Sequence, residues 1–146
     1  MAARPVVRYS APSSTADDGQ DARTRYRRKA ATTISEIVTS NRPDGATLVR
    51  ITTDGDLVQR ALRHRLDPDD HTLYVFLVPD LELADSPIRV AIGEPNLVEI
   101  ELTQLPTDGS PELRIALRLS SEQVSVDNIA VLGRNMVFVL APPTTP

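Results

Sequence analysis

The segment 23–29, with the sequence Arg-Thr-Arg-Tyr-Arg-Arg-Lys, carries the densest cluster of positive charge in the 146-residue chain. Arginine presents a planar fork of N–H donors that matches the oxygens of a carboxylate or a phosphate. Three uses follow from this chemistry. The cations can form a solvated helix face that pairs with acids upstream, such as Asp21 with Arg25, or bind the acidic surface of a neighbouring protein, or bind nucleic-acid phosphates.

Two other groups of residues have the types that catalysis or metal binding requires. Segment 67–71 (Asp-Pro-Asp-Asp-His) offers oxygen ligands and a histidine, but it lacks the glycine and the distant glutamate of a calcium loop. It is more typical of a turn between two elements. Glu99 and Glu101 are a pair of carboxylates, yet they occupy the polar row of a predicted strand, which favours a solvated position.

The sequence shows none of the usual signatures of an active site. His64 and His71 are its two histidines, and neither lies in a hydrolase or metal-binding motif. No phosphate-binding glycine loop occurs, and the lack of cysteine excludes disulfides, thiolate nucleophiles and Cys-based metal sites. We therefore expect a protein that is not an enzyme and that needs no cofactor and no metal.

The charge of the chain is divided unevenly along its length. Residues 1–29 hold seven basic and three acidic side chains, a net charge of +4, whereas residues 30–146 hold nine basic and seventeen acidic side chains, a net charge of −8. A basic front joined to an acidic body favours contact of the front with a polyanion, or with the body of another copy. Only five residues are aromatic, which argues against stacking of single-stranded nucleic acid.

Two helices are expected to position the basic residues. Tyr26, Ala30, Ile34, Ile37 and Val38 recur at steps of three and four, which predicts a helix over residues 17–40 that begins near the aspartates and ends at the turn 41–45. A second helix is predicted over 57–66, with Arg63, His64 and Arg65 near its negative end.

The remainder of the sequence predicts about seven strands. A first strand is expected at 46–52, and the short apolar run 72–78 is typical of a strand buried on both faces. Apolar and polar residues then alternate at 88–92, 98–102 and 113–119, and a hairpin between the last two would place glutamates near arginines. Strands over 124–126, 129–132 and 136–141 follow, with a type II′ turn at Gly133-Arg134.

These elements predict one α+β domain that is mainly β, an antiparallel sandwich or barrel-like fold over residues 17–141. Residues 1–16 form an extended arm and residues 142–146 a proline-rich tail, because both lack apolar periodicity. No signal peptide or long apolar run is found, so we expect a cytoplasmic protein with no membrane contact, or part of a virion assembled in the cytoplasm.

The expected function is assembly without catalysis. The partners are protein subunits, either further copies of the chain or members of a larger structure such as a phage shell, decoration or tail. The residues expected to bind them are Arg4, Arg8, Tyr9, Arg23, Arg25, Tyr26, Arg27, Arg28 and Lys29. The alternative is a nucleic-acid-associated module that places the arginines of 23–29 on phosphates. It is the second choice, because the acidic residues 30–146 argue against a large surface for nucleic acid.

Overall fold

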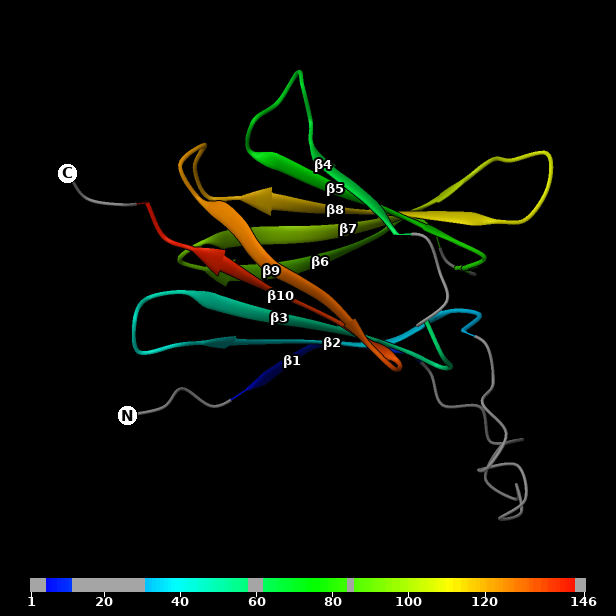
Figure 1. Ribbon diagram of the computed structural model, residues 1–146, viewed down its shortest axis with the longest axis horizontal. Coiled ribbons are helices and arrows are strands. Elements are labelled where there is room, and N and C mark those ends of the chain that lie inside the picture. The colour runs from blue at the N-terminus through cyan, green and yellow to red at the C-terminus, as the bar shows by residue number, and fades with distance from the viewer. Residues whose placement is uncertain (1–4, 12–30, 58–61, 84–85, 144–146) are drawn as a thin grey trace, which may run out of the picture.

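The chain folds into two five-stranded antiparallel sheets that pack face to face (Figure 1). The computed structural model describes residues 5–11, 31–57, 62–83 and 86–143. In spatial order, the first sheet contains β1 (Val6–Ser10), β2 (Ile34–Asn41), β3 (Thr47–Thr53), β10 (Asn135–Ala141) and β9 (Ser125–Leu132). The second sheet contains β4 (Arg63–Leu66), β5 (Leu73–Pro79), β8 (Glu112–Leu119), β7 (Leu97–Leu105) and β6 (Ile88–Glu94).

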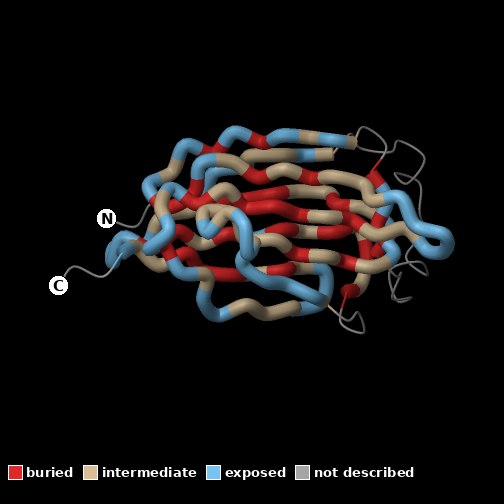
Figure 2. The backbone as a smooth tube through the Cα atoms, turned by 90° about the horizontal axis from the view of Figure 1, so that it is seen from above, coloured by how far each residue is buried: buried red, intermediate tan, exposed pale blue. Residues whose placement is uncertain are grey.

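The core lies between the sheets because each strand turns one row of apolar side chains inward. Along β8, for example, Leu113, Ile115 and Leu117 are fully buried, and Arg114 and Arg118 lie on the outer face on either side of the buried Ala116. Phe76 of β5 stacks on Phe138 of β10 with ring centroids 5.0 Å apart, which places these two strands opposite each other. Figure 2 shows the buried residues concentrated along the middle strands, with the exposed residues at the margins and in the loops.

Buried or half-buried polar side chains connect the two sheets at one end of the sandwich. Asn96, in the turn between β6 and β7, is 2% exposed. Its Nδ2 donates to the carbonyls of Gly45 and Leu140 and lies 3.2 Å from Thr47 Oγ1. The second sheet is therefore fastened to the first sheet by hydrogen bonds as well as by apolar packing.

Several predicted strands are confirmed. The alternating segments form β6, β7 and β8, and β7 and β8 make the predicted hairpin with Thr103 opposite Arg114. The two-residue turn between β9 and β10 has Gly133 at φ 63, while Arg134 does not have a positive φ, as a type II′ turn requires. Strand β5 is fully buried only at Phe76 and Val78, so the expectation of burial on both faces is wrong.

The predicted α+β class is also wrong, because the described residues contain ten strands and no helix. Part of the predicted helix 17–40 is β2, and residues 17–30 lie outside the described residues. A register shift between Ile34 and Glu36 marks a β-bulge at Ser35, so Ile34 and Ile37 both face the core although they are three residues apart. The bulge thus reproduces the spacing of a helical face.

The second predicted helix, 57–66, is wrong where the structure describes it. Residues 63–66 form β4, and residues 58–61 lie outside the described residues. The two segments predicted at 124–126 and 129–132 form the single strand β9, so the predicted segments account for seven strands. The strands β1, which lies within the predicted arm 1–16, β2 and β4 raise the total to ten. Among the described residues there is no helix that is long and apolar enough to cross a membrane.

Candidate binding surfaces

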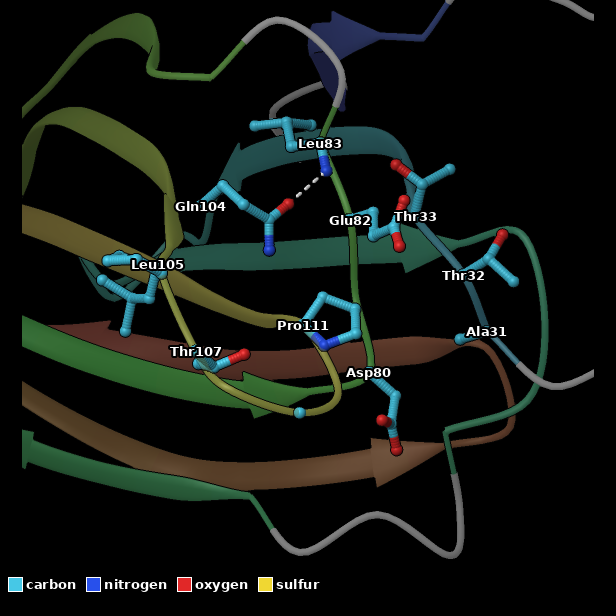
Figure 3. Close-up of a pocket in the computed structure, with 12 residues that line it drawn as sticks. Ala31, Thr32, Thr33, Asp80, Glu82, Leu83, Gln104, Leu105, Thr107 and Pro111 are labelled. Atoms are coloured by element: carbon cyan, nitrogen blue, oxygen red, sulfur yellow. Dashed lines mark hydrogen bonds between the residues drawn. The ribbon is translucent and has the colours of Figure 1, made fainter.

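A hollow of about 1150 Å³ opens at one end of the sandwich, where three connections meet (Figure 3). We call it the acidic hollow. It is lined by Ala31, Thr32, Thr33, Asp80, Glu82, Leu83, Gln104, Leu105, Pro106, Thr107, Gly109 and Pro111.

Hydrogen bonds hold each connection of the acidic hollow in place. One carboxylate, that of Asp54, accepts from the backbone N–H groups of Thr32 (2.7 Å) and Thr33 (3.0 Å) and from the Thr32 hydroxyl. The Glu82 N–H donates to the Thr32 carbonyl at 2.8 Å, which joins the segment after β5 to the segment before β2. The backbone around the hollow is therefore fixed by its own contacts.

The Gln104 side chain, from the end of β7, performs the same task from the opposite wall. Its Oε1 accepts from Leu83 N at 2.6 Å, as Figure 3 shows, and its Nε2 donates to the carbonyls of Leu81 (2.9 Å) and Glu112 (3.1 Å). Both amide protons and the oxygen are thus engaged by backbone. Gln104 is consequently a structural residue.

The described residues that line this hollow carry negative charge. Among them are Asp80 and Glu82, and none of them is a lysine, arginine or histidine. Glu82 is exposed, and its carboxylate has no partner among the described residues. Asp80 has φ 62, and its N–H donates to the Pro111 carbonyl at 2.6 Å. A positively charged segment is the chemistry that suits this lining.

A second hollow, of about 500 Å³, lies on the outer face of the second sheet, and we call it the arginine hollow. It is lined by Arg63, His64, Arg65, Asp67, Pro68, Val75, Leu77 and Arg114. Strand register explains this set. Arg63 and Arg65 of β4 lie opposite Leu77 and Val75 of β5, and Arg114 of β8 lies opposite Leu77 on its other side. Cationic side chains therefore border a half-buried apolar floor.

The three arginines differ in how far their charge is already paired. Arg63 Nη2 lies 2.5 Å from a carboxylate oxygen of Glu112, and Arg114 Nη1 lies 3.7 Å from Glu101. Arg65 has no ion-pair or hydrogen-bond partner in the described part of the chain, and it is exposed. Its guanidinium is the group of this hollow that is available to an anion.

Two of the residues predicted to bind partners lie in the described residues, and both belong to the fold. Arg8 of β1 donates to Glu94 of β6 at 2.5 Å and to the Thr39 hydroxyl at 2.9 Å, with 19% of its side chain exposed. Tyr9 packs against the core. The remaining predicted residues, Arg4, Arg23, Arg25, Tyr26, Arg27, Arg28 and Lys29, lie outside the described residues.

Segment 67–71 forms the turn between β4 and β5. Asp70 accepts from the hydroxyl of Thr72 (2.6 Å) and from Arg118 (2.6 Å), and these bonds lower the pKa of Asp70 from 3.8 to about 2. Its charge thus serves the turn. No group of three or more potential metal ligands occurs among the described residues.

The other polar residues considered from sequence also have structural surroundings. His64 Nδ1 lies 2.7 Å from the Tyr74 hydroxyl, and the two rings stack. Glu101 lies on the outer face of β7, within 2.9 Å of Arg89, while Glu99 stands opposite Arg118. This agrees with the expected glutamate–arginine rows of the hairpin.

Sequence reasoning missed both hollows. Alternating arginines at 63 and 65, and alternating acids at 80 and 82, were the available signals, but the walls of each hollow come from segments far apart in the chain. No protein-family profile, curated protein or solved structure matches this chain.

Proposed function

We propose that this chain is a non-catalytic assembly protein whose basic segment 23–29 binds the acidic hollow of a neighbouring copy. The observation that supports the proposal is the charge of the described lining of the hollow, which includes Asp80 and Glu82 and, in the part of the chain that the structure describes, no basic residue. The net charges of +4 on residues 1–29 and −8 on residues 30–146 supply the attraction between copies.

The polar groups of the acidic hollow support binding over catalysis. The Gln104 amide, the Asp54 carboxylate and the Thr32 hydroxyl all hold backbone segments together. A catalytic site needs a nucleophile, or an acid and a base, within reach of one reacting atom. In the acidic hollow, these polar side chains hold the connecting segments in place, and Asp80 and Glu82 supply negative charge.

Contact between the front of one copy and the body of the next is heterologous, and it builds rings or open chains. Such an arrangement suits a shell, a decoration layer or a tail, in the cytoplasm or in a virion assembled there. Val6 and Val7 of β1, which are 42% and 56% exposed, add apolar surface within the described part of residues 1–29.

Sedimentation velocity on the full chain tests the proposal. We expect species heavier than the 16.0 kDa monomer at about 50 μM, and their fraction should fall as salt rises because charge drives the contact. The triple variant Arg25→Glu, Arg27→Glu, Arg28→Glu should be monomeric, and so should Glu82→Lys.

Mixing provides a matched control. If segment 23–29 of one copy meets Glu82 of another, the triple variant and Glu82→Lys should associate with each other although neither associates alone. A monomer at every concentration and salt would refute the proposal. Assembly that survives the triple charge reversal would also refute it. So would a triple variant that still assembles but no longer binds DNA.

A further inference from the structure

Strand β4 is a four-residue edge strand whose two arginines oppose pairing with a neutral or basic strand but not with an acidic one. All four of its residues, Arg63–Leu66, are exposed. The pairing of each of the other described edge strands, β1, β6 and β9, contains a register shift, and β9 has Asn128 at φ 53. Bulges at an edge disturb further pairing, whereas β4 pairs with β5 without a shift.

The free side of β4 can be identified from its hydrogen bonds. Asp67 N donates to the Leu73 carbonyl at 2.8 Å, in the same register as the β4–β5 pair. Antiparallel pairs alternate between residues that bond to the partner strand and residues that do not. The N–H and C=O groups of His64 and Leu66 therefore point away from β5, toward any strand that would extend the sheet.

The side chains of β4 define the chemistry of such a strand. Arg63 and Arg65 lie on the outer face, in line with Leu77 and Val75. Arg65 shares a cross-strand row with Val75 and Ala116, and the acidic residue in this row is Glu101. Glu101 lies three strands away from Arg65, which is about 14 Å at the usual strand spacing. Glu101 is also engaged by Arg89 and Arg114. The charge of Arg65 thus remains available on the edge.

We propose that β4 binds an extended acidic segment of a partner protein, which adds to the second sheet as a sixth strand. One acidic residue of that segment pairs with Arg65 on the outer face, and the acidic residue two positions away lies beside Arg63, which also pairs with Glu112. The residues between them are apolar and lie beside His64 and Leu66, the latter being 40% exposed. Backbone bonding supplies the affinity, and the alternating acids supply the specificity.

A labelled peptide of alternating glutamate and valine is the probe, and its fluorescence anisotropy is measured with the full chain. Two control peptides separate the two contributions: one has lysine in place of glutamate, and the other has proline in place of valine and cannot form a ladder. We expect the first peptide alone to bind. Arg65→Glu should weaken its binding about tenfold, because one attraction becomes a repulsion.

Arg134→Glu is the matched control, because Arg134 is exposed, lies in the turn between β9 and β10 of the first sheet, and makes the same change of charge outside the sheet that contains β4. It should bind the peptide as the unchanged chain does. Leu66→Pro tests the backbone: the lost N–H faces away from β5, so the fold should persist while peptide binding is lost. Circular dichroism verifies the fold of each variant.

Three results would overturn the proposal: equal binding by Arg65→Glu and Arg134→Glu, equal binding of the proline-substituted peptide, or tighter binding of a single-stranded DNA oligonucleotide that Arg65→Glu alone removes. Should Leu66→Pro fail to fold, the comparison of Arg65→Glu with Arg134→Glu decides by itself. The β4 edge lies outside the acidic hollow, so peptide binding and self-assembly can fail separately.

Discussion

Replacement of Asn96 measures how strongly hydrogen bonds fasten the two sheets together. Asn96→Ala removes the donor to the Gly45 carbonyl (2.8 Å) and the Leu140 carbonyl (3.2 Å), and it leaves a cavity. A buried group that loses its partner costs about 1–3 kcal/mol. For the two carbonyls and the cavity together, we expect a loss of about 2–4 kcal/mol in the free energy of unfolding.

Chemical denaturation and a thermal melt would measure this loss. At this chain length it corresponds to a fall of about 6–12 °C in the midpoint, at about 3 °C per kcal/mol. Asn96→Leu separates the two contributions, because it fills the volume but donates no hydrogen bond. A stability of Asn96→Leu equal to that of the unchanged chain would refute the assignment of the effect to hydrogen bonding.

Asn96→Asp adds a test in which the stability of the variant should change with pH in a stated direction. Burial and the surrounding acceptor oxygens should raise the pKa of the new carboxyl in the folded state above its unfolded value of about 3.9. A raised acid pKa means that the variant is least destabilised below about pH 4 and loses stability as pH rises through its folded pKa. A difference from the unchanged chain that does not vary with pH would contradict the burial of this site.

Three further predictions follow from particular contacts. Asp70→Asn should flatten the pH dependence of stability between about pH 4 and pH 2. The folded-state pKa of Asp70, about 2, lies below its unfolded-state pKa, so its charge stabilises the fold above the unfolded-state pKa, and this stability is lost as pH falls. An unchanged slope of stability against pH in acid melts would contradict this. Phe138→Ala should lower the free energy of unfolding by about 3–5 kcal/mol in urea, because Phe138 is fully buried against Phe76, and a loss below about 1 kcal/mol would argue against that packing. Gln104→Ala should speed hydrogen exchange at the Leu83 amide, which loses its acceptor at 2.6 Å, while the amide of Val49 in β3 serves as an internal control.

The clearest of the strands that sequence predicted is β8, in which the apolar residues recur at every second position. Leu113, Ile115 and Leu117 are buried, and the row between them is Arg114, Ala116 and Arg118, so the pattern indicates both the strand and its outer face. The turn at Gly133 was equally predictable, because its two residues leave few backbone geometries open. Local chemistry decided these elements, and tertiary contacts only confirmed it.

The failures have an equally local cause. At β2, the bulge at Ser35 places Ile34 and Ile37 on one face at a separation of three, which is also the separation expected in a helix. The β-branched residues of this segment favoured a strand, and they were the better guide. At β4, four residues are too few for a period to be recognised, and two arginines resembled the end of a helix.

The candidate surfaces could not be predicted because they depend on strand order. Arg65 and Arg114 border one hollow only because β5 lies between β4 and β8 in the second sheet. Likewise, Glu82 and Gln104 line the same hollow because the segment after β5 crosses the end of β7, where Leu83 bonds to Gln104. Sequence gives the charge of each residue, but not which segments become neighbours.

The order of strands in the first sheet also sets the end of the sandwich from which a partner would approach. Val6, where β1 begins, shares a cross-strand row with Thr39, Val49 and Phe138, and β10 ends three residues after Phe138. The first strand of the described chain thus begins, and the last strand ends, at one end of the sandwich (Figure 1), whereas the connections around Thr32 and Glu82 occupy the opposite end. A partner that binds the acidic hollow would therefore approach the sandwich from the end opposite to that at which β1 begins and β10 ends.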